Sequence, residues 1–447
     1  MNLSSKRPTF HESGPRSNPY RVFALLLITA AGVWLIQQKQ HGKVQPLFMP
    51  TPTATRTANS WAEEGAALFN AGHLQGSIDA YQKALVLDPN NAQLWAELAR
   101  IQTYSSSLLT TKEERLARLQ DALASIDQAV ALAPDESTIH AIRALVLDWN
   151  ASQIPEQRDV LLNEAEAEAR RALQLESWNP LALAFYAEVL SDQQKWAQAE
   201  GYARQAVDLA PDSMDTHRVY AVVLESLGKY RQAIEEYEKA VKINPNLTFL
   251  YLSIGYNYRH LEVYDRALTS FDKAASINQQ LGIKDPLPYI AIAKTYAQQG
   301  EFFIAARNAE RAVLIDPTNA NTYAQLGRIY IQGRNYEGAI PVLKCAVEGC
   351  TAAENQQILQ QLLQSFYIEE NIGGVDIQPL PLNSLDVAFY YVQYGSILAA
   401  LDRCEEALPF LELAGATFPH ENILEIVQES KMVCATLKGS PQMEISP

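Results

Sequence analysis

Small and large apolar residues recur at fixed intervals along most of the chain. In residues 58–91 they follow the spacing of two short helices, each with one apolar stripe, and a proline closes the second helix. Small residues on both stripes would let the two backbones approach, while larger ones would fill the space around the contact. The block therefore predicts a helical hairpin. Its pattern residues are Trp61, Gly65, Leu68, Ser77, Tyr81, Ala84 and Pro89.

The same pattern returns down the chain. Two further units are stretched by insertions, one near residues 104–112 and the other near 150–157. A tenth stretch, residues 352–387, breaks the pattern with a Gln-rich helix and a Gly/Pro-rich loop. We therefore expect nine hairpins. Complete units after the first begin at Pro180, Met214, Thr248, Pro286, Ala320 and Ala388.

The repeating unit of 34 residues resembles the tetratricopeptide repeat, which places large, small, aromatic, Ala and Pro residues at these positions. The resemblance implies an all-α fold, a right-handed α-solenoid of about nine hairpins, because one hairpin cannot bury its apolar face alone. We expect eight units in residues 58–351, the irregular segment at 352–387 and a last unit at 388–420. A cap helix at 421–438 and a disordered tail at 439–447 would follow.

An uncharged run of 15 residues, 22–36, precedes the repeats. With its flanking aromatic and basic residues it predicts a transmembrane signal anchor at 20–38; a cleaved signal peptide is the alternative. More basic residues precede the run than follow it, which favours a cytoplasmic N-terminus at 1–19. Residues 39–57 are Pro/Thr-rich and suggest a stalk. We thus expect a single-pass membrane protein with its repeats outside the cytoplasm.

The N-terminal segment is basic, whereas the rest of the chain is acidic. Its formal net charge is −15, but residues 1–57 carry +6, which leaves −21 on the remainder. An acidic domain without a basic stripe repels phosphate backbones, so we expect no nucleic-acid partner.

Catalytic and metal-binding motifs are missing from the sequence. The seven histidines are scattered, no Walker-type or GxSxG motif occurs, and the four cysteines lack zinc-site spacing. We expect no cofactor, no metal and no enzymatic activity. On the repeat, Cys404 falls in a turn and Cys434 near the end of the next helix, which suggests a disulfide between them. A bridge between Cys345 and Cys350 would need a helix end to unravel.

The resemblance also implies a concave groove, lined by the first helix of each unit, that binds extended peptides or partner helices. The basic and aromatic residues at these positions suit an acidic or carboxylate-bearing segment. The alternative is that the basic residues offset neighbouring carboxylates inside the solenoid. The family's carboxylate clamp needs an Asn and Lys combination that this chain lacks. The candidate groove residues are Arg218, Phe249, Tyr256, Arg259, Lys294 and Arg328.

These observations predict a membrane-anchored scaffold or adaptor that mediates protein–protein interactions outside the cytoplasm. The alternative function is a non-catalytic regulatory or assembly subunit of a cell-envelope enzyme complex. The fold itself does not distinguish the two.

Overall fold

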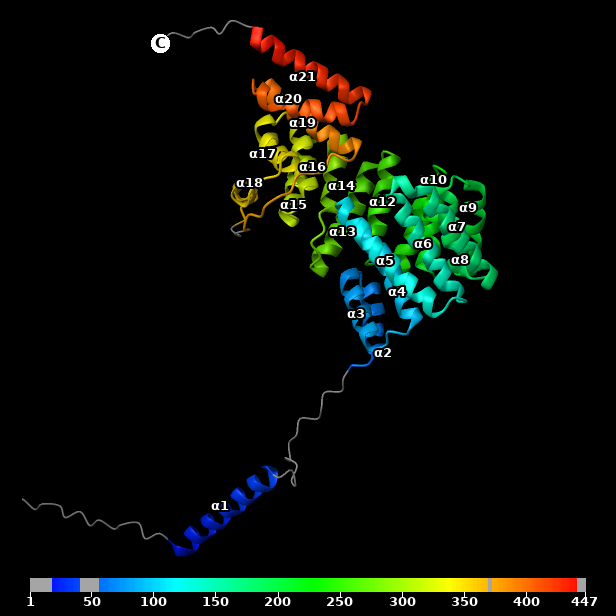
Figure 1. Cartoon of the computed structure of the whole chain (residues 1–447), viewed down its shortest axis with the longest axis vertical. Coiled ribbons are helices and arrows are strands. Elements are labelled where there is room, and N and C mark those ends of the chain that lie inside the picture. The colour runs from blue at the N-terminus through cyan, green and yellow to red at the C-terminus, as the bar shows by residue number, and fades with distance from the viewer. Residues whose placement is uncertain (1–17, 41–55, 369–371, 440–447) are drawn as a thin grey trace, which may run out of the picture. The chain divides into compact units, whose positions relative to one another are not determined.

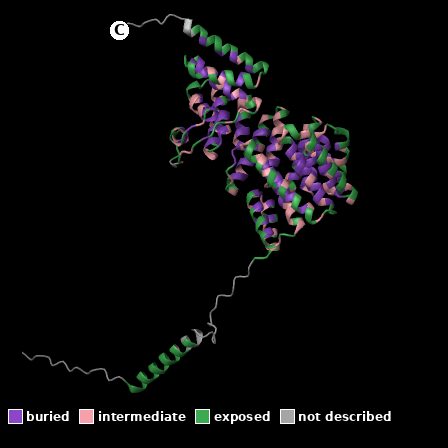
Figure 2. Ribbon diagram, viewed as in Figure 1, coloured by how far each residue is buried: buried purple, intermediate pink, exposed green. Residues whose placement is uncertain are grey.

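The computed structural model describes residues 18–40, 56–368 and 372–439 of the chain. These residues form 21 α-helices and no strand, and the chain divides into two compact units, Met1–Arg56 and Thr57–Pro447 (Figure 1). The first unit is described by one helix, α1 (Pro19–Gln40), and its residues 19–34 are almost all exposed (Figure 2).

The sequence prediction of a membrane span at residues 20–38 is wrong. No helix in the described ranges is long and apolar enough to cross a bilayer. The uncharged run in α1 has 15 residues, against about 20 that a span needs. Arg21 and the polar end Gln37–Gln40 complete the helix without adding apolar length. The predicted single-pass location, with a cytoplasmic N-terminus and extracytoplasmic repeats, is contradicted by this finding. Most of the predicted segments 1–19, 39–57 and 439–447 lies outside the described residues.

The second unit consists of antiparallel helix pairs, each formed by neighbours in sequence. The first five pairs are α2 (Ala58–Asn70) with α3 (Leu74–Leu87), α4 (Ala92–Ser106) with α5 (Lys112–Leu132), α6 (Ser137–Gln153) with α7 (Arg158–Leu175), α8 (Pro180–Asp192) with α9 (Trp196–Leu209), and α10 (Met214–Ser226) with α11 (Tyr230–Ile243). A short 3-10 helix, Pro155–Gln157, precedes α7.

Four more pairs follow, interrupted once. They are α12 (Thr248–His260) with α13 (Tyr264–Leu281), α14 (Leu287–Gln298) with α15 (Phe302–Ile315), α16 (Ala320–Gln332) with α17 (Tyr336–Val347), and α19 (Leu385–Ala400) with α20 (Cys404–Thr417). The lone helix α18 (Ala352–Ser365) stands between the last two pairs, and α21 (Glu421–Gly439) ends the stack.

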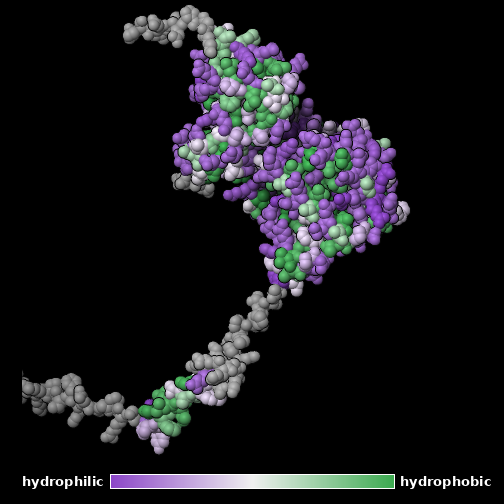
Figure 3. All heavy atoms as spheres, viewed as in Figure 1, coloured by the Kyte–Doolittle hydropathy of each residue, from purple (hydrophilic) through white to green (hydrophobic). Residues whose placement is uncertain are grey.

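The small residues of the repeat lie where paired helices touch. A Cβ atom added to Gly65 of α2 would come within 2.6 Å of the Tyr81 ring of α3. The Ser77 hydroxyl donates a hydrogen bond of 2.6 Å to the Gly65 carbonyl across the same contact. Gly255 of α12 meets the Phe271 ring of α13 in the same way. The buried positions therefore lie along the pair contacts (Figure 2), and the visible surface is mostly hydrophilic with scattered apolar groups (Figure 3).

The irregular segment is an insertion in the stack. Helix α19 packs on α16 and α17, so the last pair directly follows the α16–α17 pair in space. Helix α18 instead contacts α15 and α17 from outside the stack. The returning chain is held by a backbone bridge between Cys350 and Ile377 and by the Leu380 N–H, which donates to the Ala346 carbonyl at 2.8 Å.

Both cysteine pairs are joined in the structure. Cys404, at the start of α20, is bonded to Cys434 of α21, with 5.7 Å between the Cα atoms. Cys345 is bonded to Cys350, with 4.7 Å between the Cα atoms. Helix α17 ends at Val347, so Cys350 already lies outside it and the second bridge requires no unravelling.

The first hairpins close onto later ones. The Asn244 side chain donates a hydrogen bond of 2.8 Å to the side chain of Asn70. Arg100 of α4 reaches Asp215 of α10 at 3.0 Å, and the Tyr104 ring stacks on Phe249 of α12 with 5.7 Å between centroids. These contacts turn α2–α12 into a closed turn of the solenoid with a filled interior.

Candidate functional site: a basic pocket between α12, α14 and α16

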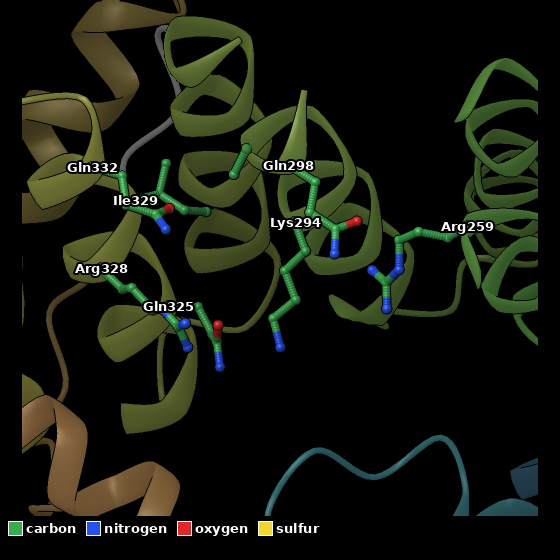
Figure 4. A pocket seen from close by; sticks show the side chains of 8 residues that line it. Arg259, Lys294, Gln298, Gln325, Arg328, Ile329 and Gln332 are labelled. Carbon is green, nitrogen blue, oxygen red and sulfur yellow. The ribbon is translucent and has the colours of Figure 1, made fainter. Parts of the chain in front are cut away.

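Three basic side chains come together on the first helices of consecutive pairs. Arg259 of α12, Lys294 of α14 and Arg328 of α16 line one pocket of about 250 Å³. In Figure 4 the Lys294 side chain extends between the two arginines, and all three reach toward the same space. Neutral side chains complete the lining; they include Gln298, Gln325, Ile329 and Gln332.

None of the three cations has an acidic partner among the described residues. Within the described part of the chain, no carboxylate oxygen lies within 4.0 Å of the Arg259, Lys294 or Arg328 nitrogens. The Nη1 atom of Arg259 is buried and forms no hydrogen bond, and its guanidinium lies over the Tyr256 ring at 5.1 Å. The Lys294 and Arg328 side chains remain accessible within the pocket. Together they form an uncompensated positive patch in an acidic domain.

Neighbouring positive charges and burial destabilise the charged form of Lys294 in this pocket. The recessed position of Lys294 lowers the pKa of its ammonium, and the nearby guanidinium groups of Arg259 and Arg328 lower it further. The carboxylate of Asp386 acts in the opposite direction but does not overcome them. Burial likewise lowers the pKa of Arg259. An anion in the pocket would relieve both effects.

The pocket opens into a larger cavity of about 480 Å³ that the repeats alone do not enclose. Two segments outside the repeat pattern contribute to its walls beside the repeat helices: the α4–α5 insertion (residues 107–115), through residues 110–115, and the return strap (residues 377–384), through residues 380–384. The insertion is fixed where Asn319 donates to the Thr110 hydroxyl and where Arg115 donates to the Leu109 carbonyl at 3.1 Å. The strap is held by the Tyr391 hydroxyl, which donates to the Leu380 carbonyl at 3.0 Å.

These two walls were not identified by sequence reasoning, which treated both segments as interruptions of the repeat. No local motif marks them as groove residues. Their place depends on the superhelical turn that brings residue 110 next to residue 319, and a single unit carries no information on that turn.

Of the six predicted groove residues, four line the basic pocket or the adjoining cavity and two are buried. Arg259, Lys294 and Arg328 share the basic pocket, and Tyr256 borders its extension. Arg218 is instead enclosed, donating two hydrogen bonds of 2.8 and 2.7 Å to the Glu188 carboxylate. Phe249 is buried against Tyr104. Arg218 thus fits the alternative in which a basic residue offsets an interior carboxylate.

Within the ranges that the structure describes, no three His, Cys, Asp or Glu side chains meet in a possible metal site.

Two family models match the chain. The tetratricopeptide repeat model matches residues 58–91, and the model for anaphase-promoting complex, cyclosome, subunit 3 matches residues 160–240. With the stacked helix pairs, these matches show that the chain is a tetratricopeptide-repeat protein, an α-solenoid. Proteins of this class are generally non-catalytic and bind protein or peptide partners.

Other comparisons are distant. No curated protein matches the chain. The tetratricopeptide-repeat protein TTC0263 from Thermus thermophilus is 18% identical, covering 45% of this chain and 98% of its own, at a TM-score of 0.37. A tetratricopeptide-repeat protein from Parabacteroides merdae is also 18% identical, covering 61% and 98%, at a TM-score of 0.35. The structure of YrrB, described as having an unusual peptide-binding site, is 20% identical, covering 45% and 94%, at a TM-score of 0.26. Scores this low do not bear on the site.

Proposed function

We propose that this protein is a non-catalytic scaffold that holds a partner protein through an acidic segment bound in the basic pocket. The observation that carries the proposal is the convergence of Arg259, Lys294 and Arg328 without any acidic partner in the described chain. The enclosed Arg100 and Arg218, by contrast, meet carboxylates of the chain itself. A site that lacks such partners is suited to take them from another molecule.

The charge of the domain supports selectivity in this mode of binding. Residues 58–447 carry a net charge of −21, so an acidic partner is repelled by most of the surface. Attraction is confined to the pocket, which would fix the place and register of the bound segment. Tyr256 and Leu287 on the cavity wall offer apolar contact to the flanking residues of the partner.

Capture of partners by full-length protein tests the proposal. The variant carries Lys294→Glu with Arg328→Glu, which reverses the charge of the pocket at two accessible positions. The matched control carries Arg204→Glu with Arg266→Glu, which makes the same charge change at exposed positions on second helices. Quantitative mass spectrometry of co-purified proteins is the measurement.

We expect the pocket variant to capture about tenfold less of the specific partner than the wild type, because attractive contacts to acidic groups would become repulsive. The control variant should capture as much partner as the wild type. The same partner captured equally by both variants would remove the pocket from the proposal. One enzyme captured in stoichiometric amount by the wild type would identify the scaffold as the assembly subunit of that enzyme.

A further inference from the structure

The charge balance of the basic pocket indicates more than a preference for acidic residues. Three cations share about 250 Å³, and the carboxylate that acts on the pKa of Lys294 is that of Asp386, which lies beyond ion-pair distance. One carboxylate from a ligand would leave most of the positive charge uncompensated. A ligand group that carries about two negative charges at a single centre matches the pocket better.

The number of hydrogen-bond donors in the basic pocket also favours a ligand group with about two negative charges. Each guanidinium offers several N–H donors in a fixed fork, and an ammonium offers three. The buried Nη1 of Arg259 has no acceptor. Gln298 and Gln332 add neutral amide groups to the pocket lining, while the Gln325 amide already donates to the Tyr390 hydroxyl. A carboxylate has two acceptor oxygens, whereas a phosphoryl group presents three from one atom.

The walls limit the size of the ligand group. Because the 107–115 insertion and the 377–384 strap border the adjoining cavity, they restrict the room beside the basic pocket. Two neighbouring acidic side chains could match the charge only if both entered the basic pocket, which holds about 250 Å³. A single phosphorylated side chain carries about the same two negative charges as two acidic side chains.

We propose that the basic pocket is a phosphoryl-binding site, with Arg259, Lys294 and Arg328 surrounding the dianion. The proposal rests on the proposed function for the source of that group, a phosphorylated side chain on a bound partner segment. A free phosphorylated small molecule carries the same chemistry, and the experiment separates the two sources.

Fluorescence anisotropy with full-length protein is the test. The probes are three dye-labelled ten-residue Gly/Ala peptides that differ only at the centre, where they carry phosphoserine, glutamate or serine. Unlabelled O-phosphoserine and inorganic phosphate serve as competitors. The protein variants are wild type, Arg259→Gln with Arg328→Gln, the charge-conserving Arg259→Lys, and the control Arg266→Gln on α13.

We expect the phosphoserine peptide to bind about tenfold more tightly than the glutamate peptide, as charge-assisted contacts to a dianion are stronger and more numerous. The double glutamine variant should lose this preference, and Arg266→Gln should keep it. Arg259→Lys should weaken phosphopeptide binding by a few-fold, because the ammonium cannot reproduce the fork.

Each outcome separates the two proposals. Equal binding of the phosphoserine and glutamate peptides would overturn the phosphoryl site and leave the acidic-segment scaffold intact. Equal affinity for O-phosphoserine and the phosphopeptide, with unchanged protein capture by the charge-reversal variant, would support the phosphoryl site but overturn its use for partner binding. No binding by any phosphorylated probe would overturn the inference.

A change in thermal stability provides an independent readout. Inorganic phosphate at millimolar concentration should raise the melting temperature of the wild type and of Arg266→Gln, but not that of the double glutamine variant. If all three proteins respond equally, the effect is a general salt effect and counts against the site.

Discussion

Two arginines on neighbouring first helices have opposite surroundings. Arg218 of α10 is enclosed by the closed turn and bonded to Glu188, whereas Arg259 of α12 faces the basic pocket with no carboxylate of the described residues within ion-pair distance. Burial lowers the pKa of both, but the carboxylate of Glu188 reverses this for Arg218 and raises its pKa well above the usual value. Burial alone therefore does not determine the pKa of a buried cation; the presence of an acidic partner among the described residues does.

The same contrast holds between the closed turn, α2–α12, and the basic pocket as a whole. In the closed turn, Arg100 has both Glu97 and Asp215, at 2.7 and 3.0 Å. In the basic pocket, three cations have no such partner within the described residues. In the first region charge pairs hold distant helices together, whereas in the second burial and the guanidinium groups of Arg259 and Arg328 lower the pKa of Lys294.

The largest expected effect comes from removing the structural cation. Arg218→Met leaves the Glu188 carboxylate buried without its partner, and we expect it to lower the free energy of unfolding by about 3–5 kcal/mol. Urea denaturation followed by circular dichroism is the measurement. The double variant Arg218→Met with Glu188→Leu should recover much of the loss. A change below about 1 kcal/mol in the single variant would mean that Arg218 is not a structural ion-pair residue.

An intermediate effect concerns Glu225, a buried carboxylate in the same region. Burial raises its pKa to about 7, although Asn257 and the Tyr237 hydroxyl donate hydrogen bonds to it. Between its unfolded pKa near 4.5 and this value, the folded state binds more protons, so this group makes stability fall as the pH rises. A rise of the pKa from 4.5 to about 7 corresponds to roughly 3 kcal/mol of lost stability once the pH exceeds both values.

Glu225→Gln should therefore be more stable than the wild type at pH 8, with the difference vanishing near pH 4.5. Denaturation at a series of pH values gives the difference curve directly. Asp192, whose pKa is raised to about 6 by burial and by Glu188, acts in the same direction in both proteins and cancels in the comparison. A difference that does not change with pH would show that Glu225 is charged throughout.

The smallest effect is expected in the basic pocket. Lys294→Gln removes one of three mutually repelling charges, so the unliganded protein should be unchanged or slightly more stable, by at most about 0.5 kcal/mol because solvent screens this accessible side chain. Differential scanning calorimetry without phosphate is the measurement, with Lys294→Met testing whether any change comes from packing. A loss above about 1 kcal/mol would place Lys294 with Arg218 as a structural residue.

The fold could be predicted because its evidence is local. Gly65, Ser77 and Tyr81 lie within one unit, and their spacing alone dictates that two helices pack closely. Position on the first helix also selected Arg259, Lys294 and Arg328, which line one pocket. The same positional rule selected Arg218 and Phe249, which the structure encloses, because the rule assumes an open groove and does not anticipate that Tyr104 fills it. For α1, the flanking residues suggested a span that its apolar length does not support.

The closure of α4 onto α10 changes how this array can unfold. In an open row of hairpins each unit depends only on its neighbours, so the ends can melt one unit at a time. Here Arg100 and Asp215 are 115 residues apart in sequence, and Asn70 and Asn244 are 174 apart. Losing the first hairpins would expose the interior face of α10 and α12, so the segment from α2 to α12 should behave as one cooperative block, with high contact order and correspondingly slow formation.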